Sequence, residues 1–151
     1  MQPNHQGINL SPLEQILDLS FLTVAVNTSV LEAIALFNQT QASCVLIVEK
    51  LQLVGIFTTR DVVRLVVSGK DLSTLKLAEV MTKEVVTLTQ SKATDAIAAL
   101  SLMRQYQIHH LPIVDESGQL LGLVTQSSLL QGFIPTKFCN SNTPKIKIGD
   151  C

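Results

Sequence analysis

The chain has 151 residues, of which 46% are apolar and 15% are charged, and its formal net charge is −1 at pH 7. Such an apolar composition, with fewer charges than the roughly 25% of typical soluble proteins, argues against disorder. A near-neutral net charge does not indicate the basic surface that nucleic-acid-binding proteins have. No apolar run approaches the roughly 20 residues needed to cross a bilayer, and the start does not resemble a signal peptide. We therefore expect a cytoplasmic protein without membrane insertion.

The three cysteines, Cys44, Cys139 and Cys151, make an odd count and include no CxxC pair. This pattern argues against a disulfide framework and against a structural zinc site. We expect Cys44, at the start of the apolar run CVLIV, to behave as a small buried hydrophobic residue.

The first half of the chain predicts alternating helices and strands. Residues 1–10 are expected to form a tail, and Ser11-Pro12-Leu13-Glu14 has the N-cap, proline and acid of a helix start. A short strand over Thr23–Val26 precedes a second helix, whose capping box is Ser29 with Glu32. Apolar residues then recur at helical spacing. We therefore expect a strand, then a helix with one buried face.

A hairpin and a third helix complete this half. Cys44–Val48 and Leu53–Phe57 are branched apolar runs separated by a link of hairpin length. The segment Arg60–Ser68 predicts a helix with Val62, Leu65 and Val66 on its buried face, ending at Gly69. The joining segment 71–81 is expected to pack Leu75, Leu77 and Val80 on a core shared by both halves.

The second half repeats the first. The segment ASCVLIVEKLQLVGIFT at 42–58 matches IHHLPIVDESGQLLGLVT at 108–125, and Gly55 and Gly122 are 67 positions apart, as are Thr58 and Thr125. A strand over 85–89, a helix marked by Ala96, Leu100 and Met103, strands over 109–114 and 120–124, and a helix over 127–133 follow in the same order. One copy has too small a sheet to bury its apolar face alone, whereas two copies related by a pseudo-twofold axis bury each other's.

The segment Gly55-Ile56-Phe57-Thr58-Thr59-Arg60-Asp61 carries the strongest local signal for a binding site. A strand ends here and a helix begins, and the free amides and dipole of a helix start attract anions such as phosphate. Asp61 has the chemistry to accept hydrogen bonds from a ribose diol, and Gly55 would let a base approach the backbone. An alternative is equally specific: Thr58-x-x-Asp61 is also the pattern of a capping box, in which the acid only closes its own helix.

The repeated plan, together with Val80-Met81-Thr82 before Val86-Thr87-Leu88, the strand IHHLPIVD and the Gly-x-x-Thr-x-x-Asp turn, resembles a tandem cystathionine-β-synthase (CBS) domain pair, also called a Bateman module. The resemblance implies an α/β (α+β) fold of two β-α-β-β-α repeats, covering about 11–70 and 76–135 within a pair at 11–135. Residues 136–151 are then a C-terminal tail that leads to an effector domain if the chain is part of a longer parent.

Members of this family usually sense adenine nucleotides such as AMP, ADP or ATP, or S-adenosylmethionine, in clefts between the repeats. The resemblance implies a first site with Gly55, Thr58, Arg60 and Asp61 against Val86, Thr87 and Leu88 of the other repeat. It implies a second site with Gly122 and Thr125 against Thr23 and Val24. The second site has Ser128 where the first has Asp61, and a neutral hydroxyl is a weaker partner for a ribose diol. We therefore expect one competent site and one weak or empty site.

His109 and His110 are adjacent on a predicted strand, so alternation points them to opposite faces and into different environments. They cannot bind one metal together, and the family often uses this stretch for phosphate contacts; the alternative is that one is solvated and the other is a hydrogen-bonded core residue. Arg64, Lys83, Lys92 and Arg104 are further candidate phosphate partners, although such residues are more often simply solvated.

No spacing in the sequence suggests a catalytic nucleophile with its base, so we expect no enzyme activity and no required cofactor. The first hypothesis is a regulatory module that binds an adenine nucleotide, forms a homodimer and passes occupancy to a linked or partner effector. The second is a dimerisation or docking module without a ligand, in which Asp61 is only a helix cap.

Overall fold

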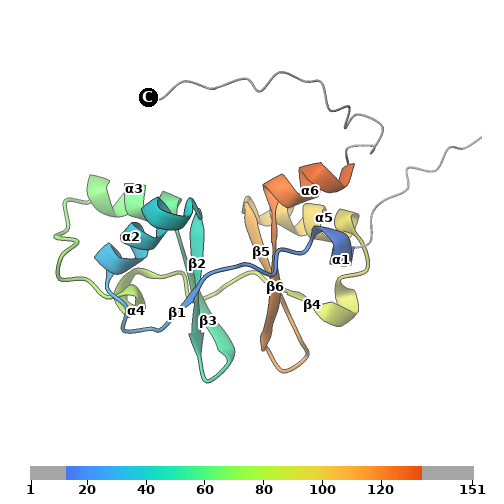
Figure 1. Cartoon of the computed structure of the whole chain (residues 1–151), viewed down its shortest axis with the longest axis horizontal. Coiled ribbons are helices and arrows are strands. Elements are labelled where there is room, and N and C mark those ends of the chain that lie inside the picture. The colour runs from blue at the N-terminus through green and yellow to red at the C-terminus, as the bar shows by residue number, and fades with distance from the viewer. Residues whose placement is uncertain (1–12, 134–151) are drawn as a thin grey trace, which may run out of the picture.

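The computed structural model describes residues 13–133, which form two similar halves lying side by side (Figure 1). The helices are α1 (Leu13–Ile16), α2 (Val30–Thr40), α3 (Thr59–Val67), α4 (Leu77–Val80), α5 (Ala96–Tyr106) and α6 (Gln126–Phe133). The strands are β1 (Thr23–Val24), β2 (Cys44–Glu49), β3 (Gln52–Thr58), β4 (Leu88–Thr89), β5 (His110–Val114) and β6 (Leu120–Thr125), and a 3-10 turn spans Gln90–Lys92. The mixed content and the order of elements confirm the predicted α+β repeat.

The two halves have the same sheet. The first sheet has the order β1-β2-β3 and the second has the order β4-β5-β6, and in each a parallel pair is followed by an antiparallel hairpin. Both hairpins contain a register shift at the corresponding point, after Ile47 in the first and after Ile113 in the second. The duplication therefore extends to irregular backbone as well as to the apolar pattern.

Local signals place the helices as predicted. The backbone amide of Ser29 donates to the carboxylate of Glu32, and the Glu32 amide donates back to the Ser29 hydroxyl, which is the expected capping box at α2. Gly69, directly after α3 and its C-cap, has a φ of 69°, a conformation that glycine adopts without steric cost. Val66 is the exception, because it is 61% exposed whereas the sequence places it on the buried face of α3.

Each of the short helices α1 and α4 precedes the opening strand of one half and packs on the other half. Leu13 and Ile16 of α1 belong to the core of the second half, while Leu77 of α4 belongs to the core of the first. The crossing of these two segments between the halves is visible in Figure 1. The expected single shared core is thus wrong: Leu75, Leu77 and Val80 pack on the core of the first half alone.

A smaller apolar cluster joins the halves. Cys44, Leu46 and Ile56 of the first half pack with Leu123 of the second, and this cluster is separate from the two larger cores. Burial, followed by the charge of Asp18, raises the pKa of the Cys44 thiol to about 12, so the thiol stays protonated as a small apolar group. The pseudo-twofold packing predicted from the duplication is therefore carried by this interface.

Some predictions fall outside the described residues or differ at element ends. Ser11 and Pro12, both tails, Cys139 and Cys151 lie outside residues 13–133. The opening strands are shorter than expected, since β1 has two residues and β4 has two. Within residues 13–133, none of the helices has the length and apolar character needed to cross a membrane.

Candidate functional site

A cleft of about 280 Å³, hereafter the first cleft, lies where the two halves meet beside the start of α3. Its walls come from three places in the chain: the end of β3 with the start of α3, the segment before β4, and the turn from α5 into β5. Its lining residues are Ile56, Thr58, Thr59, Arg60, Asp61 and Arg64; Thr82, Glu84, Val85 and Val86; and Tyr106, Gln107, Ile108, His109 and His110.

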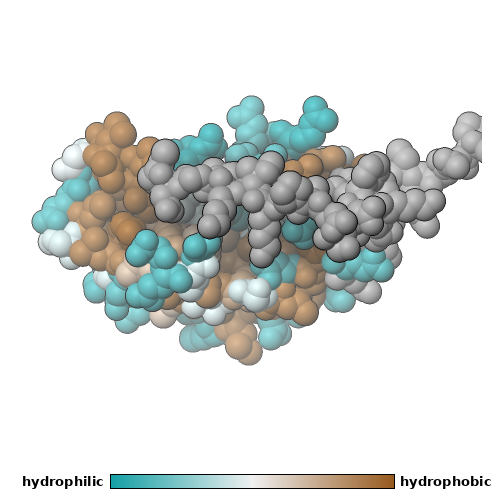
Figure 2. Space-filling model, turned by 45° about the horizontal axis from the view of Figure 1, so that its top comes forward, coloured by the Kyte–Doolittle hydropathy of each residue, from teal (hydrophilic) through white to brown (hydrophobic). Residues whose placement is uncertain are grey.

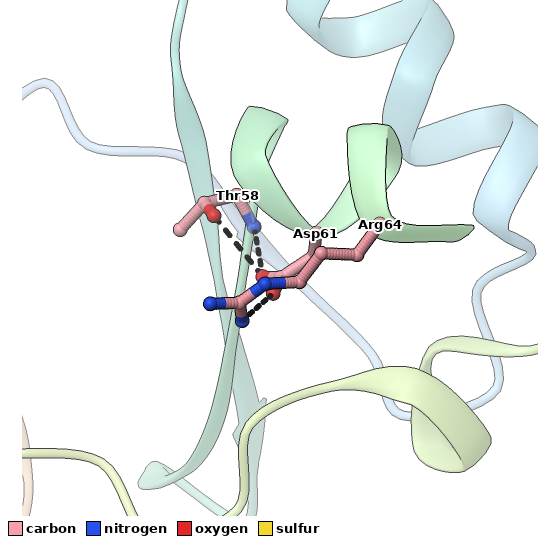
Figure 3. Close-up of polar contacts among 3 residues, drawn as sticks. All are labelled: Thr58, Asp61 and Arg64. Atoms are coloured by element: carbon pink, nitrogen blue, oxygen red, sulfur yellow. Dashed lines mark hydrogen bonds and ion pairs between the residues drawn. The ribbon is translucent and has the colours of Figure 1, made fainter. Parts of the chain in front are cut away.

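The carboxylate of Asp61 is held at the start of α3. One oxygen accepts hydrogen bonds from the Thr58 backbone amide at 2.9 Å and from the Thr58 hydroxyl at 3.1 Å. The other lies 3.6 Å from a guanidinium nitrogen of Arg64 (Figure 3). Asp61 therefore does close its own helix, as the capping alternative predicts, and it also lies on the wall of a cleft.

Arg60 and Arg64 supply positive charge to this cleft. The Arg64 side chain is largely exposed and pairs with Asp61, whereas Arg60 is exposed and makes no ion pair within the described part of the chain. The N-terminal end of the α3 dipole adds partial positive charge at the same end, while the Thr58 and Thr59 amides already donate to Asp61 and to the Ser43 carbonyl. This end of the cleft has the chemistry of an anion site.

The other walls are largely apolar. Ile56, Val85, Val86 and Ile108 line the cleft from both halves. Tyr106, the chain's one tyrosine, lines it as well and is about half exposed. An aromatic ring and branched aliphatic side chains suit the flat apolar faces of a nucleobase.

His109 and His110 differ in environment but line the same cleft. His109 is exposed, while His110 is partly buried and its Nε2 lies 2.7 Å from the Ser43 hydroxyl of the other half. Burial, followed by the neighbouring His109, lowers the pKa of His110 below its ordinary value of 6.5. Strand alternation does not send the two residues to different clefts, because β5 begins only at His110.

A second cleft of about 520 Å³ lies at the equivalent place in the other half. It is lined by Gln15, Ile16, Leu17, Asp18, Thr125, Ser127, Ser128 and Gln131. With the repeat offset of 67 residues, Ser127 stands for Arg60, Ser128 for Asp61 and Gln131 for Arg64. Among the residues that the structure describes, the wall of the second cleft therefore has no cationic side chain and has the acid Asp18.

Ser128 keeps the capping role that Asp61 has in the first half. Its hydroxyl accepts from the Thr125 amide at 3.0 Å, and its own amide donates to the Thr125 hydroxyl at 3.1 Å. The start of α6 is therefore closed without a carboxylate. Within the described lining, what the second cleft lacks relative to the first is positive charge, not a helix cap.

The structure brings together about half of the residues proposed from the sequence. Thr58, Arg60, Asp61, Val86, His109 and His110 line the first cleft, and Thr125 lines the second. The remaining six, Gly55, Thr87, Leu88, Gly122, Thr23 and Val24, line neither cleft.

Packing explains four of these positions. A Cβ at Gly55 would overlap the Met81 sulfur, so the missing side chain admits the segment after α4 rather than a base. Leu88 is buried in the core of the second half, and Thr23 and Val24 pair with β2. The opening strands β1 and β4 are thus part of the sheets, and the residues just before β4 form one wall of the first cleft.

Sequence reasoning missed several lining residues. Glu84 lies in the segment before β4, and Tyr106 and Gln107 are the last residue and the C-cap of α5, none of them in a motif of its own. In the sequence, the one feature that connects Tyr106 with the candidate site is its position shortly before the His109-His110 pair. Within residues 13–133, no three His, Cys, Asp or Glu side chains are grouped as metal ligands would be.

Comparison with known proteins identifies the repeat. The family model of the CBS domain matches residues 13–68 and 77–134, the same two halves that the structure shows. The chain belongs to the CBS domain family. The CBS domain-containing protein YhcV of Bacillus subtilis is 32% identical over 121 residues, which cover 80% of this chain and 84% of YhcV.

Solved CBS domain structures share the fold. A protein with CBS domains from Burkholderia ambifaria is 27% identical with a TM-score of 0.73, covering 82% of this chain and 94% of that one. The CBS domain pair of protein MJ0100, in complex with 5′-methylthioadenosine and S-adenosyl-L-methionine, is 25% identical with a TM-score of 0.72, covering 82% and 99%. The chain spans about half the length of two other curated relatives, 45% and 58%.

Proposed function

We propose that this CBS pair is a regulatory, non-catalytic module that binds an adenine nucleotide in the first cleft. The observation that carries the proposal is the joining of Arg60, Arg64 and Asp61 with an apolar wall in one cleft between the halves. Phosphate would meet Arg60 and the start of α3, and the base would lie along Val85, Val86 and Ile108. The adenosyl ligands of MJ0100, which has the same fold, support an adenosine-containing ligand.

The ligand's position also supports a route for signalling. Because the cleft has walls from both halves, a bound nucleotide would favour one relative arrangement of the halves over another already populated. An effector that senses this arrangement, either on the same polypeptide or on a partner, would then respond to occupancy. Relatives that extend well beyond the matched region are consistent with a linked effector.

A thermal-shift panel tests binding. Ligand at 100 times its Kd adds about 2.7 kcal/mol of apparent stability, which for a domain of this size raises Tm by roughly 5–11 °C. We expect this rise for at least one of AMP, ADP, ATP and S-adenosylmethionine, and no rise for GMP. Arg60→Ala should remove most of the shift, whereas Ser127→Ala at the equivalent position of the second half should keep it.

The outcome that favours the docking alternative is equally definite. If every adenine ligand at millimolar concentration leaves the melting curve unchanged, the first cleft is not a nucleotide site. Asp61 is then a helix cap only, and the module acts through its surfaces.

We infer a homodimer from an apolar face. Val63, Val66 and Val67 of α3 and Leu130 of α6 are exposed, and Val63 and Leu130 occupy equivalent positions of the two repeats. The two helices lie on the same side of the molecule in Figure 1, and Figure 2 shows an apolar area at the end that carries α3. A face that is apolar in both repeats suits a second copy of the module.

Size-exclusion chromatography with light scattering tests the dimer. Val67→Asp should give a monomer, because Val67 is 82% exposed on this face. Leu51→Asp, a similarly exposed leucine in the β2–β3 hairpin turn, should leave the mass unchanged. A monomeric wild-type protein at micromolar concentration would contradict the inference.

A further inference from the structure

The first cleft has balanced charge. Two cations, Arg60 and Arg64, and two acids, Asp61 and Glu84, line it, and its other lining side chains are uncharged when the histidines are neutral. Three of these charges come from α3, whereas Glu84 comes from a different wall, the segment before β4. The empty cleft therefore holds no large excess of positive side-chain charge.

The positive charge available to a ligand is smaller than the number of arginines indicates. Arg64 is 3.6 Å from Asp61, so part of its charge is already met within α3. Arg60 has no ion pair within residues 13–133 and remains available. One free guanidinium and the N-terminal end of the α3 dipole can neutralise about one phosphate group.

The size of the cleft agrees with this limit. Small-molecule sites commonly have about 300–1,000 Å³, and the first cleft, at about 280 Å³, is at the lower end. Each phosphate beyond the first would need room near the charged end and would bring more negative charge into a cleft that contains the Glu84 carboxylate. Like charges in a partly enclosed site repel more strongly than in open water.

We propose that Glu84 is a specificity-determining residue that restricts the first cleft to ligands with a single phosphate. This inference rests on the proposed nucleotide binding at the same cleft and names the ligand class there: a nucleoside monophosphate rather than a di- or triphosphate. Glu84 contributes by repulsion of the extra phosphates, not by contact with the ligand that is accepted.

Isothermal titration calorimetry with adenosine, AMP, ADP and ATP in magnesium-free buffer tests it. For the wild-type protein we expect AMP to bind most tightly and ATP most weakly of the three nucleotides. Glu84→Gln should raise ATP affinity relative to AMP affinity by about fivefold at low ionic strength. Glu116→Gln, which changes the net charge equally in the exposed β5–β6 turn, should leave that ratio unchanged.

Two further arms distinguish charge from shape. The rise in relative ATP affinity caused by Glu84→Gln should shrink at 0.5 M salt, because exposed charges are screened there. Mg²⁺ should narrow the difference between the AMP and ATP affinities of the wild-type protein, because it neutralises part of the triphosphate. Tighter wild-type binding of ATP than AMP, or an ATP-to-AMP ratio that Glu84→Gln does not alter, would overturn the inference while nucleotide binding itself stands. Absence of binding by every ligand would overturn both.

Discussion

The two clefts of this CBS pair have the same backbone plan and different chemistry. Each lies at the start of a helix that follows a hairpin, and each has a capping residue three positions after a threonine. The first presents Arg60, Asp61 and Arg64, and the second presents Ser127, Ser128 and Gln131. Duplication thus preserved the backbone plan and the helix cap of each half and not the charges that line the cleft.

The difference shows which of two roles of Asp61 the fold requires. A serine closes α6 as the aspartate closes α3, so a carboxylate is not needed for capping. The second cleft is the larger of the two, yet the described residues of its wall include an acid and no cation. The clefts therefore differ most in the placement of the arginines, and volume does not favour the first.

The largest expected effect comes from giving the first cleft the residues of the second. Arg60→Ser with Arg64→Gln should weaken AMP binding by about 100-fold, since hydrogen bonds to charged groups contribute roughly 1.5–3 kcal/mol each and 1.4 kcal/mol is tenfold. Both positions are exposed, so stability should change little. Calorimetry for affinity and thermal melts for stability measure the two quantities separately.

The reciprocal exchange serves as its control. Ser127→Arg, Ser128→Asp and Gln131→Arg together should raise the number of AMP molecules bound from one to two per chain. If the double variant of the first cleft binds AMP as the wild type does, the charge difference is not what separates the clefts.

Gly55 and Gly122, which the two crossing segments approach closely, should differ in how well they tolerate substitution by alanine. A Cβ at Gly122 would lie 2.5 Å from the branched Cγ of Leu17, whereas one at Gly55 would meet the sulfur of the more flexible Met81. Gly122→Ala should lower the free energy of unfolding by about 1–3 kcal/mol. Gly55→Ala should cost less than about 1 kcal/mol, because the methionine can move and a less flexible unfolded chain offsets part of the strain. Urea denaturation of both variants measures this; equal losses would contradict it.

Substitutions at Asp61 separate capping from ligand binding. Asp61→Ala should lower stability by about 1 kcal/mol through loss of the cap, and Asp61→Ser should restore it, as Ser128 does in α6. AMP affinity should fall in both variants, because neither has a carboxylate for the ribose. Ser128→Ala, the matched change in the second half, should lower stability by a similar amount and leave AMP affinity unchanged. Recovery of affinity in Asp61→Ser would show that the carboxylate acts only as a cap.

Much of this fold can be predicted from the sequence, because its signals are local. The Ser29–Glu32 capping box, the hairpin runs and the 67-residue offset each depend on near neighbours in the chain. The core on which α1 and α4 pack is not decided by near neighbours, because Leu13 and Leu77 are apolar residues that either of two similar cores accepts. Sequence pattern cannot distinguish two equivalent partners, so the exchange of segments was missed.

Only the part of the candidate site that depends on local sequence signals could be predicted. Thr58, Arg60 and Asp61 are consecutive features of one helix start, and they lie where expected. Glu84, in the segment before β4, and Tyr106, the last residue of α5, reach the cleft only because these parts of the chain lie together after the halves have packed. The contact between Ser43, just before β2, and His110, the first residue of β5, likewise depends on how the two halves pack together.

That contact gives the smallest of the predicted effects, a pH dependence at the junction of the halves. Because the pKa of His110 lies below 6.5 in the folded protein, the unfolded chain takes up the proton more readily. Stability should therefore be full above about pH 6.5 and should fall as the pH drops from 6.5 towards the folded pKa. The groups around His110 in the cleft are His109, Asp61, Glu84, Arg60 and Arg64.

His110→Gln should flatten this part of the stability profile, measured by urea midpoints from pH 7.5 to 5. His109→Gln should keep most of the slope, because burial, the larger cause of the lowered pKa, remains. A slope unchanged in His110→Gln would place the titrating group elsewhere in the chain.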